Sequence, residues 1–106
     1  MSKYLIEGTY LAQGSQGLVK EGGTSRRVFI EGLVKSIGGS IESLYYAFGD
    51  VDIYCIVDMP DAATMAALSL AVNSTESVRI KTIVLMDPSV IDTASNKAVN
   101  YQPPGQ

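Results

Sequence analysis

The first periodic segment of the chain, residues 3–12, alternates between two sets of side chains. Tyr4, Ile6 and Tyr10 share one parity, and Glu7 and Thr9 share the other. A two-residue period is typical of a strand, so the pattern predicts a β-strand here. Residues 13–20 are rich in glycine and polar side chains, and we expect a short turn or loop.

A helical period follows the Gly22-Gly23 break. The apolar positions are Phe29, Ile30, Leu33, Val34 and Ile37. Their one-, three- and four-residue spacing predicts a helix with one apolar side. Thr24 or Ser25 is suited to cap the start of this helix, which we expect to end at about Ile37, where Gly38-Gly39 follows.

Two runs rich in β-branched and aromatic residues, 40–48 and 51–57, flank the turn candidate Gly49-Asp50 and predict a hairpin. Pro60 and Asp61 are suited to the start of a second helix through Val72. Its many alanines favour close packing against a sheet. Residues 78–86 predict the last strand.

The end of the sequence differs from the rest. After Asp87-Pro88 we expect a short helix to about Lys97, and the Pro103-Pro104 tail should be extended and lie on a neighbouring surface. We therefore divide the chain into a domain over residues 1–98 and an extended tail over residues 99–106.

The predicted order of elements is strand, helix, strand, strand, helix, strand. This order indicates an α+β fold of ferredoxin-like βαββαβ topology, a four-stranded antiparallel sheet with both helices on one face. The strands carry large apolar residues at both parities, such as Leu44 and Tyr46 opposite Ile41 and Tyr45. An apolar second face predicts that two copies pair sheet to sheet, as a homodimer or a multiple of dimers.

Composition narrows the class of protein. Of 106 residues, 46% are hydrophobic and 18% charged, the net charge is -3, and no apolar run reaches the 18 or more residues of a membrane-spanning helix. The basic residues are scattered apart from Arg26-Arg27, which argues against nucleic acid. The first residues lack the pattern of a secretory signal, so we expect a cytoplasmic protein without a membrane partner.

Histidine is absent and Cys55 is the single cysteine. We expect Cys55 to be a small buried hydrophobe. One cysteine without histidine does not make a zinc site or the usual haem ligand, so no metal and no cofactor are predicted.

Six polar residues alternate along three predicted strands and could converge on one sheet face: Glu42, Tyr46, Asp52, Tyr54, Arg79 and Lys81. In a barrel interior, Asp52 or Glu42 could act as a base while Tyr46 or Tyr54 donates a hydrogen bond to an anion. The alternative is that the carboxylates pair with Arg79 or Lys81 across neighbouring strands. The sequence favours this second interpretation.

The start of the first predicted helix is a second candidate site. Thr24, Ser25, Arg26 and Arg27 combine hydroxyls, free helical amides and two guanidinium groups, which suits phosphate or carboxylate. The alternative, which we favour, is a glycine break with a helix cap and two solvated arginines.

The order of motifs resembles the GYD domain family over nearly the whole chain. The matching pieces are residues 3–6 (KYLI), 22–27 (GGTSRR), 33–39 (LVKSIGG), 46–54 (YAFGDVDIY), 67–72 (ALSLAV) and 101–105 (YQPPG). The family's name comes from a Gly-Tyr-Asp element, and here valine stands near the expected tyrosine, within Gly49-Asp50-Val51-Asp52.

The resemblance implies a dimeric α+β barrel and no particular reaction, because related barrels include monooxygenases, isomerases and ligand-sensing domains. We expect a homo-oligomeric module that binds a small organic or anionic molecule. The rival hypotheses are a cofactor-free enzyme of isomerase or monooxygenase type, and an association domain without a ligand.

Overall fold

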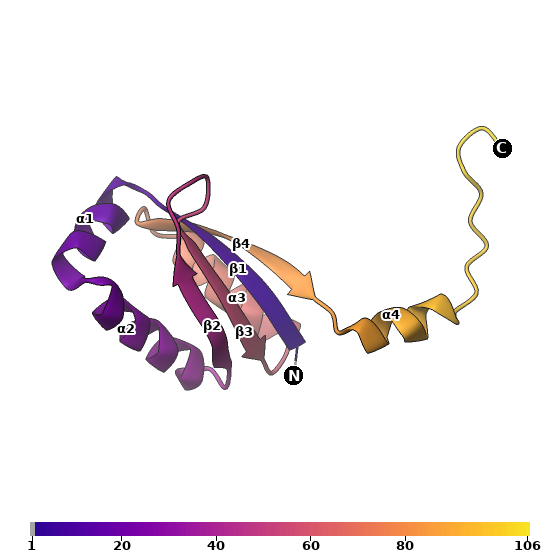
Figure 1. Ribbon diagram of the computed structural model, residues 1–106, viewed down its shortest axis with the longest axis horizontal. Helices are drawn as coiled ribbons and strands as arrows, with labels where there is room; N and C mark the ends of the chain where they lie inside the picture. The colour runs from indigo at the N-terminus through magenta and orange to yellow at the C-terminus, as the bar shows by residue number, and fades with distance from the viewer. Residues whose placement is uncertain (1) are drawn as a thin grey trace.

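The computed structural model describes residues 2–106 and contains four strands and four helices (Figure 1). In chain order they are β1 (Ser2–Tyr10), α1 (Ala12–Glu21), α2 (Gly23–Ser36), β2 (Ser40–Tyr46), β3 (Ile53–Met59), α3 (Ala62–Asn73), β4 (Val78–Leu85) and α4 (Pro88–Ser95). The strands form one antiparallel sheet in the order β2-β3-β1-β4. This is the ferredoxin-like arrangement, so the predicted α+β fold is confirmed.

Helices α2 and α3 cover one face of the sheet, here called the helix face. The buried core lies between these layers and consists of Tyr4, Val34, Leu44, Ile53, Cys55, Val57, Met59, Met65 and Leu68. Strand β3 contributes every second residue to it, as the two-residue period of a strand dictates, while β1 and β2 contribute one residue each and β4 none. Burial of each such aliphatic side chain is worth about 1.5–3 kcal/mol.

The opposite side of the sheet, here called the open face, has no helix packed on it within residues 2–106. Its middle row of side chains is apolar: the pairing register places Ile56, Leu5 and Ile83 next to one another on β3, β1 and β4. Leu5 and Ile56 are half-buried by their neighbours, and Ile83 keeps 40% of its surface exposed. The apolar second face predicted from the sequence is therefore limited to this middle row, and charged residues such as Lys3, Glu7, Asp58 and Lys81 lie on either side of it.

Helix α1 corrects the sequence-based prediction of a loop over residues 13–20. Its first turn rests against the turn before β4, where the Leu11 amide donates to the Ser77 carbonyl at 2.9 Å. At Gly14 the backbones are so close that a Cβ atom would meet the Ser77 carbonyl oxygen at 2.0 Å. The glycine that suggested a loop is thus what allows a helix to dock.

Glycines also separate and end the helices. Gly22, with φ 84°, breaks the path between α1 and α2, and Gly38, with φ 88°, ends α2 near the predicted stop. Residues with a side chain rarely adopt such positive φ angles, which is why glycine occupies both positions. Asp61 caps α3 by accepting from the Thr64 amide at 2.7 Å.

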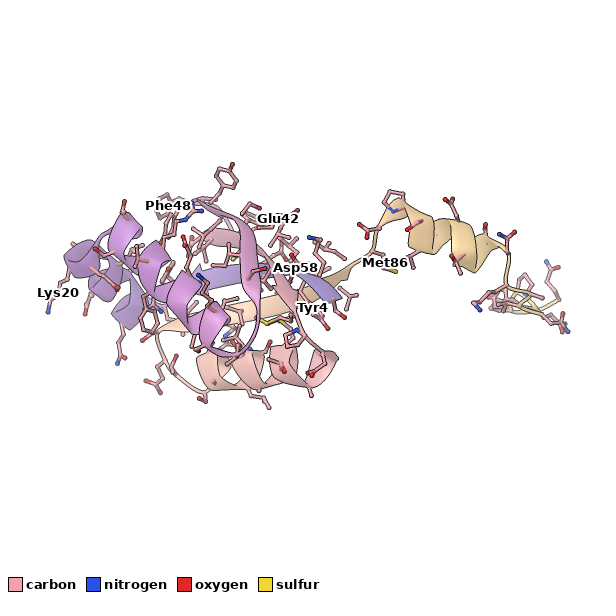
Figure 2. The ribbon with its side chains drawn as sticks, turned by 90° about the horizontal axis from the view of Figure 1, so that it is seen from below. Tyr4, Lys20, Glu42, Phe48, Asp58 and Met86 are labelled. Carbon is pink, nitrogen blue, oxygen red and sulfur yellow. The ribbon has the colours of Figure 1, made fainter. Side chains whose placement is uncertain are left out.

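Residues 87–106, here called the C-terminal arm, extend away from the rest of the molecule (Figure 2). Helix α4 packs against no helix or strand of the part that the structure describes. The radius of gyration is consequently 17.0 Å, against about 13 Å for a compact chain of this length. The tail after α4 contains no helix or strand and has a turn at its end.

Among the described residues, no helix is both long and apolar enough to cross a membrane.

Candidate functional site

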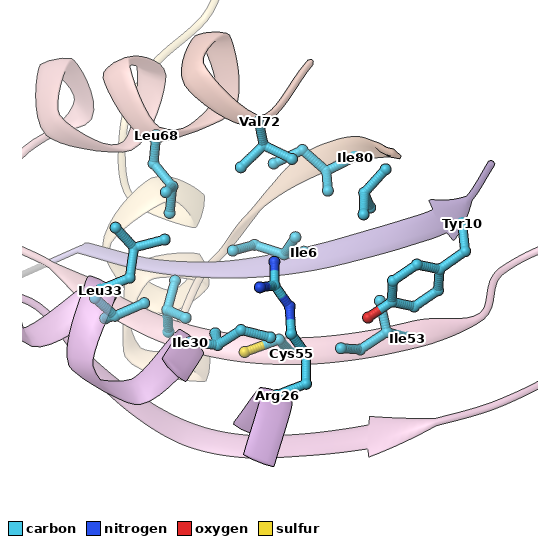
Figure 3. Close-up of a pocket in the computed structure, with 13 residues that line it drawn as sticks. Ile6, Tyr10, Arg26, Ile30, Leu33, Ile53, Cys55, Leu68, Val72 and Ile80 are labelled. Atoms are coloured by element: carbon cyan, nitrogen blue, oxygen red, sulfur yellow. The ribbon is translucent and has the colours of Figure 1, made fainter. Parts of the chain in front are cut away.

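A cavity of about 80 Å³ lies between α2, α3 and the helix face of the sheet (Figure 3). Its walls are apolar: Ile30 and Leu33 come from α2, Leu68 and Val72 from α3, and Ile6, Ile53 and Ile80 from the strands. The cavity exists because α2 and α3 each pack on the sheet and little on each other. We call it the Arg26 cavity after the charged residue that reaches into it.

Arg26 projects from the first turns of α2 towards Ile6, and its guanidinium group lies in the space that the apolar walls enclose (Figure 3). The Arg26 side chain is only 32% exposed. Its Cζ atom lies 4.6 Å from the centre of the Phe29 ring, so part of its charge faces an aromatic ring. Its ion-pair partner in the described chain is Glu21, with Nη1 and Oε2 as far apart as 4.0 Å.

Tyr10 adds a second polar group to the cavity wall. Burial raises the pKa of its phenol to about 12, and nearby Tyr46 adds to this shift while Arg26 opposes it. The phenol is therefore neutral in ordinary solution and keeps a proton to donate. The Tyr46 hydroxyl itself donates to the Gly23 carbonyl at 3.2 Å, which ties β2 to the start of α2.

A second, more polar hollow of about 140 Å³ adjoins the cavity beneath α1. It shares Tyr10, Arg26 and Val78 with the Arg26 cavity, and Gln13 and Glu21 of α1 add polar groups. Arg26 and Tyr10 thus stand between an apolar chamber and a polar one. This arrangement suits a small molecule with an apolar part and a negatively charged group.

The four residues of the predicted anion cradle are not brought together. Thr24 and Ser25 are exposed and make no cap at the start of α2. Arg27 turns outward and bonds Glu31 through its Nε atom at 2.7 Å, one helical turn away. Arg26 alone reaches the interior, because it lies on the side of α2 that faces the sheet.

Four of the six polar residues predicted to converge share one face of the sheet, but they do not gather at one place. Tyr54, Arg79 and Lys81 lie on the open face by their strand register, whereas Glu42 lies on the opposite edge strand from Arg79 and Lys81, beside Lys3. Tyr46 lies on the helix face instead. A bulge between Ile41 and Ser43 explains the error, because one extra residue reverses the parity of everything after it.

Asp52 lies directly before β3, and its carboxylate is already engaged by the backbone of β1. Its Oδ2 atom accepts from the Tyr10 amide at 2.8 Å, and its own amide donates to the Gly8 carbonyl at 2.8 Å. Asp52 therefore fastens the β2–β3 loop to the end of β1. An acid–base pair of Asp52 with Tyr46 is not assembled.

The open face carries ion pairs of the kind that the sequence favoured, but with a different cation. Lys3 lies 3.2 Å from Asp58 and 3.3 Å from Glu42, whereas Arg79 and Lys81 bond neither carboxylate. Hydrogen bonds to both carboxylates raise the pKa of Lys3, with Asp58 the larger cause. Sequence analysis missed Lys3, although its parity with Glu7 and Thr9 marks it as an open-face residue.

Sequence analysis also missed Tyr10 and Glu21 as neighbours of Arg26. The parity that Tyr10 shares with Ile6 could have placed Tyr10 on the helix face. Nothing in residues 13–20 indicated a helix that would bring Glu21 close to Arg26.

Cys55 is buried and unpaired, as predicted, and burial raises the pKa of its thiol to about 11. Over residues 2–106, no three or more Cys, Asp or Glu side chains cluster in a way that would hold a metal ion.

Comparison with known proteins gives one match. The family model described as "GYD domain" matches residues 4–94 of the 106-residue chain. No curated protein matches the chain, and no solved structure does.

Proposed function

The chain belongs to the GYD domain family, and within that family we propose that it is a homo-oligomeric module that binds a small organic anion. The carboxylate of the ligand lies at Arg26, and its apolar part fills the Arg26 cavity. One observation carries the proposal: the partly buried Arg26 side chain reaches into an apolar cavity, and its carboxylate partner lies 4.0 Å away.

Arg26 is unlike the other paired side chains of the chain. Arg27 contacts Glu31 at 2.7 Å and Lys3 contacts Asp58 at 3.2 Å, whereas Arg26 lies 4.0 Å from Glu21. A partly buried charge without a close carboxylate is incompletely paired, and a carboxylate can bond a guanidinium group through two parallel hydrogen bonds. A bound carboxylate would supply the close partner that Glu21 does not.

The size of the cavity limits the apolar part of the ligand. A dry cavity of about 150 Å³ holds benzene, so the 80 Å³ found here suits about three or four carbon atoms. The neutral phenol of Tyr10 can donate a hydrogen bond to the second oxygen of the carboxylate. Short straight or branched carboxylic acids combine these features.

The open face supports association with a second copy. Its apolar middle row is flanked by Lys3, Arg79 and Lys81, three positive charges, and by Glu7, Glu42 and Asp58, three negative charges. The charges therefore sum to zero, which removes net repulsion between two identical faces. Burial of the row Leu5, Ile56 and Ile83 provides the driving force.

Ligand binding is tested by isothermal titration calorimetry with butyrate and isobutyrate, and with acetate and 1-butanol as probes that lack the tail or the charge. We expect both four-carbon acids to bind more tightly than either probe. Arg26→Gln should weaken butyrate binding about ten- to hundredfold, the value of a hydrogen bond to a charged group. Arg27→Gln, a neighbouring surface arginine, is the matched control and should bind as the unaltered protein does.

Glu21→Gln should change the affinity for butyrate in the opposite direction to Arg26→Gln. Because the Glu21 carboxylate competes for Arg26, its neutralisation should tighten butyrate binding. The anion proposal is wrong if butyrate, acetate and 1-butanol bind alike, or if Arg26→Gln and Arg27→Gln give the same affinity.

Association is tested separately by analytical ultracentrifugation of Ile56→Lys. A lysine in the middle row would be buried without a partner in a sheet-to-sheet pair, so dissociation to monomers is expected. Lys20→Glu on α1 is a surface control that should keep the assembly. A monomeric unaltered protein, or an Ile56→Lys variant that assembles normally, would contradict association through this face.

A further inference from the structure

Helix α3 lacks a polar side. No residue from Ala62 to Asn73 is charged, although only Met65 and Leu68 are buried against the sheet. The outward residues form what we call the α3 stripe: Ala63, Ala66, Ala67, Leu70 and Ala71, all of them exposed. Leu70 alone keeps 73% of its surface in solvent. A helix with an apolar outer side and no charged residue is normally covered, so the stripe is a surface suited to a partner.

The C-terminal arm is the complementary feature, because it has apolar side chains and no surface of its own to bury them on. Val90 and Ile91 of α4 are 44% and 56% exposed, and Ala94 lies one turn further along. Helix α4 has eight residues, whereas isolated helices shorter than about 12 residues are marginal in water. Helix α4 therefore needs packing from another surface to be stable.

We infer that α4 of one copy packs along the α3 stripe of a second copy, and that the second copy returns the same contact. The two surfaces match in length, since the eight residues of α4 and the nine positions from Ala63 to Ala71 each span about 12–14 Å. Alanines on the stripe let the two helix axes come close. No charged side chain of α3 opposes the contact.

The arrangement of the arm favours a second copy over the arm's own body. The arm leaves β4 along the long axis of the molecule, and α4 lies far from α3 of the same chain in both views (Figures 1 and 2). Each copy thus offers one arm and one free stripe. In a two-fold symmetric pair, each arm packs on the stripe of the other copy, so both arms and both stripes are covered. This contact lies on the helix side of the fold and goes beyond the association of open faces proposed above.

Limited trypsin digestion tests the inference, because Lys97 follows α4 and its cleavage releases residues 98–106, a fragment that mass spectrometry quantifies. Docking should protect this bond, so the rate of release per chain should rise when the protein is diluted. Leu70→Asp on the stripe and Ile91→Asp on the arm should each accelerate release about tenfold, since proteolysis tracks the population of the undocked form. Val19→Asp, on an exposed valine of α1, should release the fragment at the unaltered rate.

Two results would overturn the inference. If Leu70→Asp, Val19→Asp and the unaltered protein release the fragment equally fast, the stripe does not hold the arm. If Leu70→Asp accelerates release but the unaltered rate does not change on dilution, the arm docks within its own chain. Because Ile56→Lys probes the open face and Leu70→Asp the stripe, failure of one contact is separable from failure of the other.

Circular dichroism of each variant reports whether the fold is kept. Disulfide formation between engineered cysteines is an independent test of whether α4 lies on the α3 stripe. One chain carrying Ala67→Cys and another carrying Ile91→Cys should form a mixed disulfide on oxidation. The pair Lys20→Cys and Ile91→Cys, with one cysteine far from the stripe, should not exceed the background of random pairing. Equal yields from the two pairs would also refute docking on the stripe.

Discussion

Replacement of Asp52 by alanine should lower the free energy of unfolding by about 2 kcal/mol. The Asp52 carboxylate accepts from the Tyr10 amide at 2.8 Å in a partly buried position. Hydrogen bonds to charged groups contribute about 1.5–3 kcal/mol, and alanine leaves the Tyr10 amide without its acceptor. The backbone bonds of residue 52 to Gly8 and Ala47 remain, so the loss isolates the side chain.

Two further variants sharpen this experiment. Asp52→Asn keeps an acceptor oxygen but loses the charge, so about half of the loss is expected. Asp50→Ala alters the neighbouring exposed carboxyl group, and Asp50 contributes its backbone oxygen to Thr9, which alanine retains. It should change the free energy of unfolding by no more than about 0.5 kcal/mol.

Urea denaturation followed by circular dichroism measures all three variants, at one protomer concentration because association adds to apparent stability. An Asp52→Ala variant as stable as Asp50→Ala would refute the role of Asp52 as a fastening for the β2–β3 loop. In that case the carboxylate would be free for another task, including the acid–base role considered from the sequence.

Three other predictions concern single positions. Gly14→Ala should displace α1 from Ser77 and destabilise the protein. Gly17→Ala places its methyl group in open space and should stabilise the protein by up to about 1 kcal/mol. Equal melting temperatures of the two variants would contradict the close approach at Gly14. The folded pKa of Cys55, about 11, exceeds its usual 9.0, so its contribution to stability is complete below pH 9 and is lost as the pH rises towards 11. A Cys55→Ala variant should therefore lose less stability over that interval, as urea denaturation at each pH would show. The Thr64 amide and hydroxyl lower the pKa of Asp61, so its cap strengthens α3 at neutral pH and weakens as the pH falls through the lowered pKa; Asp61→Ala should abolish this part of the acid dependence of thermal melting.

Much of the fold could be predicted from local patterns. Alternation along β1 and β4 and the helical spacing of α2 identified these elements, because each buries one side and exposes the other. Helix α1 escaped because it buries no side chain and contains Gly14 and Gly17. Its position depends on a backbone contact with Ser77, distant in sequence, which no local period records.

The candidate site was less accessible to sequence reasoning. The bulge at Ile41–Ser43 reversed the side on which Tyr46 lies, and a bulge leaves little trace in composition. The Arg26 cavity arises from the separation of α2 and α3 on the sheet, which is a property of packing. Sequence could nominate Arg26 and Arg27 as a pair, but only the three-dimensional structure distinguishes the inward arginine from the outward one.

The glycine break at Gly22 separates helix α1, which lines the polar hollow, from the elements that form the buried core. Helix α1 buries none of its residues in the core, yet Gln13, Leu18 and Glu21 line the polar hollow beside Arg26. The sheet, α2 and α3 carry the stability of the fold. Substitutions at Gln13, Leu18 or Glu21 can therefore change which molecules the hollow accepts at little cost to folding, so these positions are where selection or protein engineering could alter ligand preference most freely.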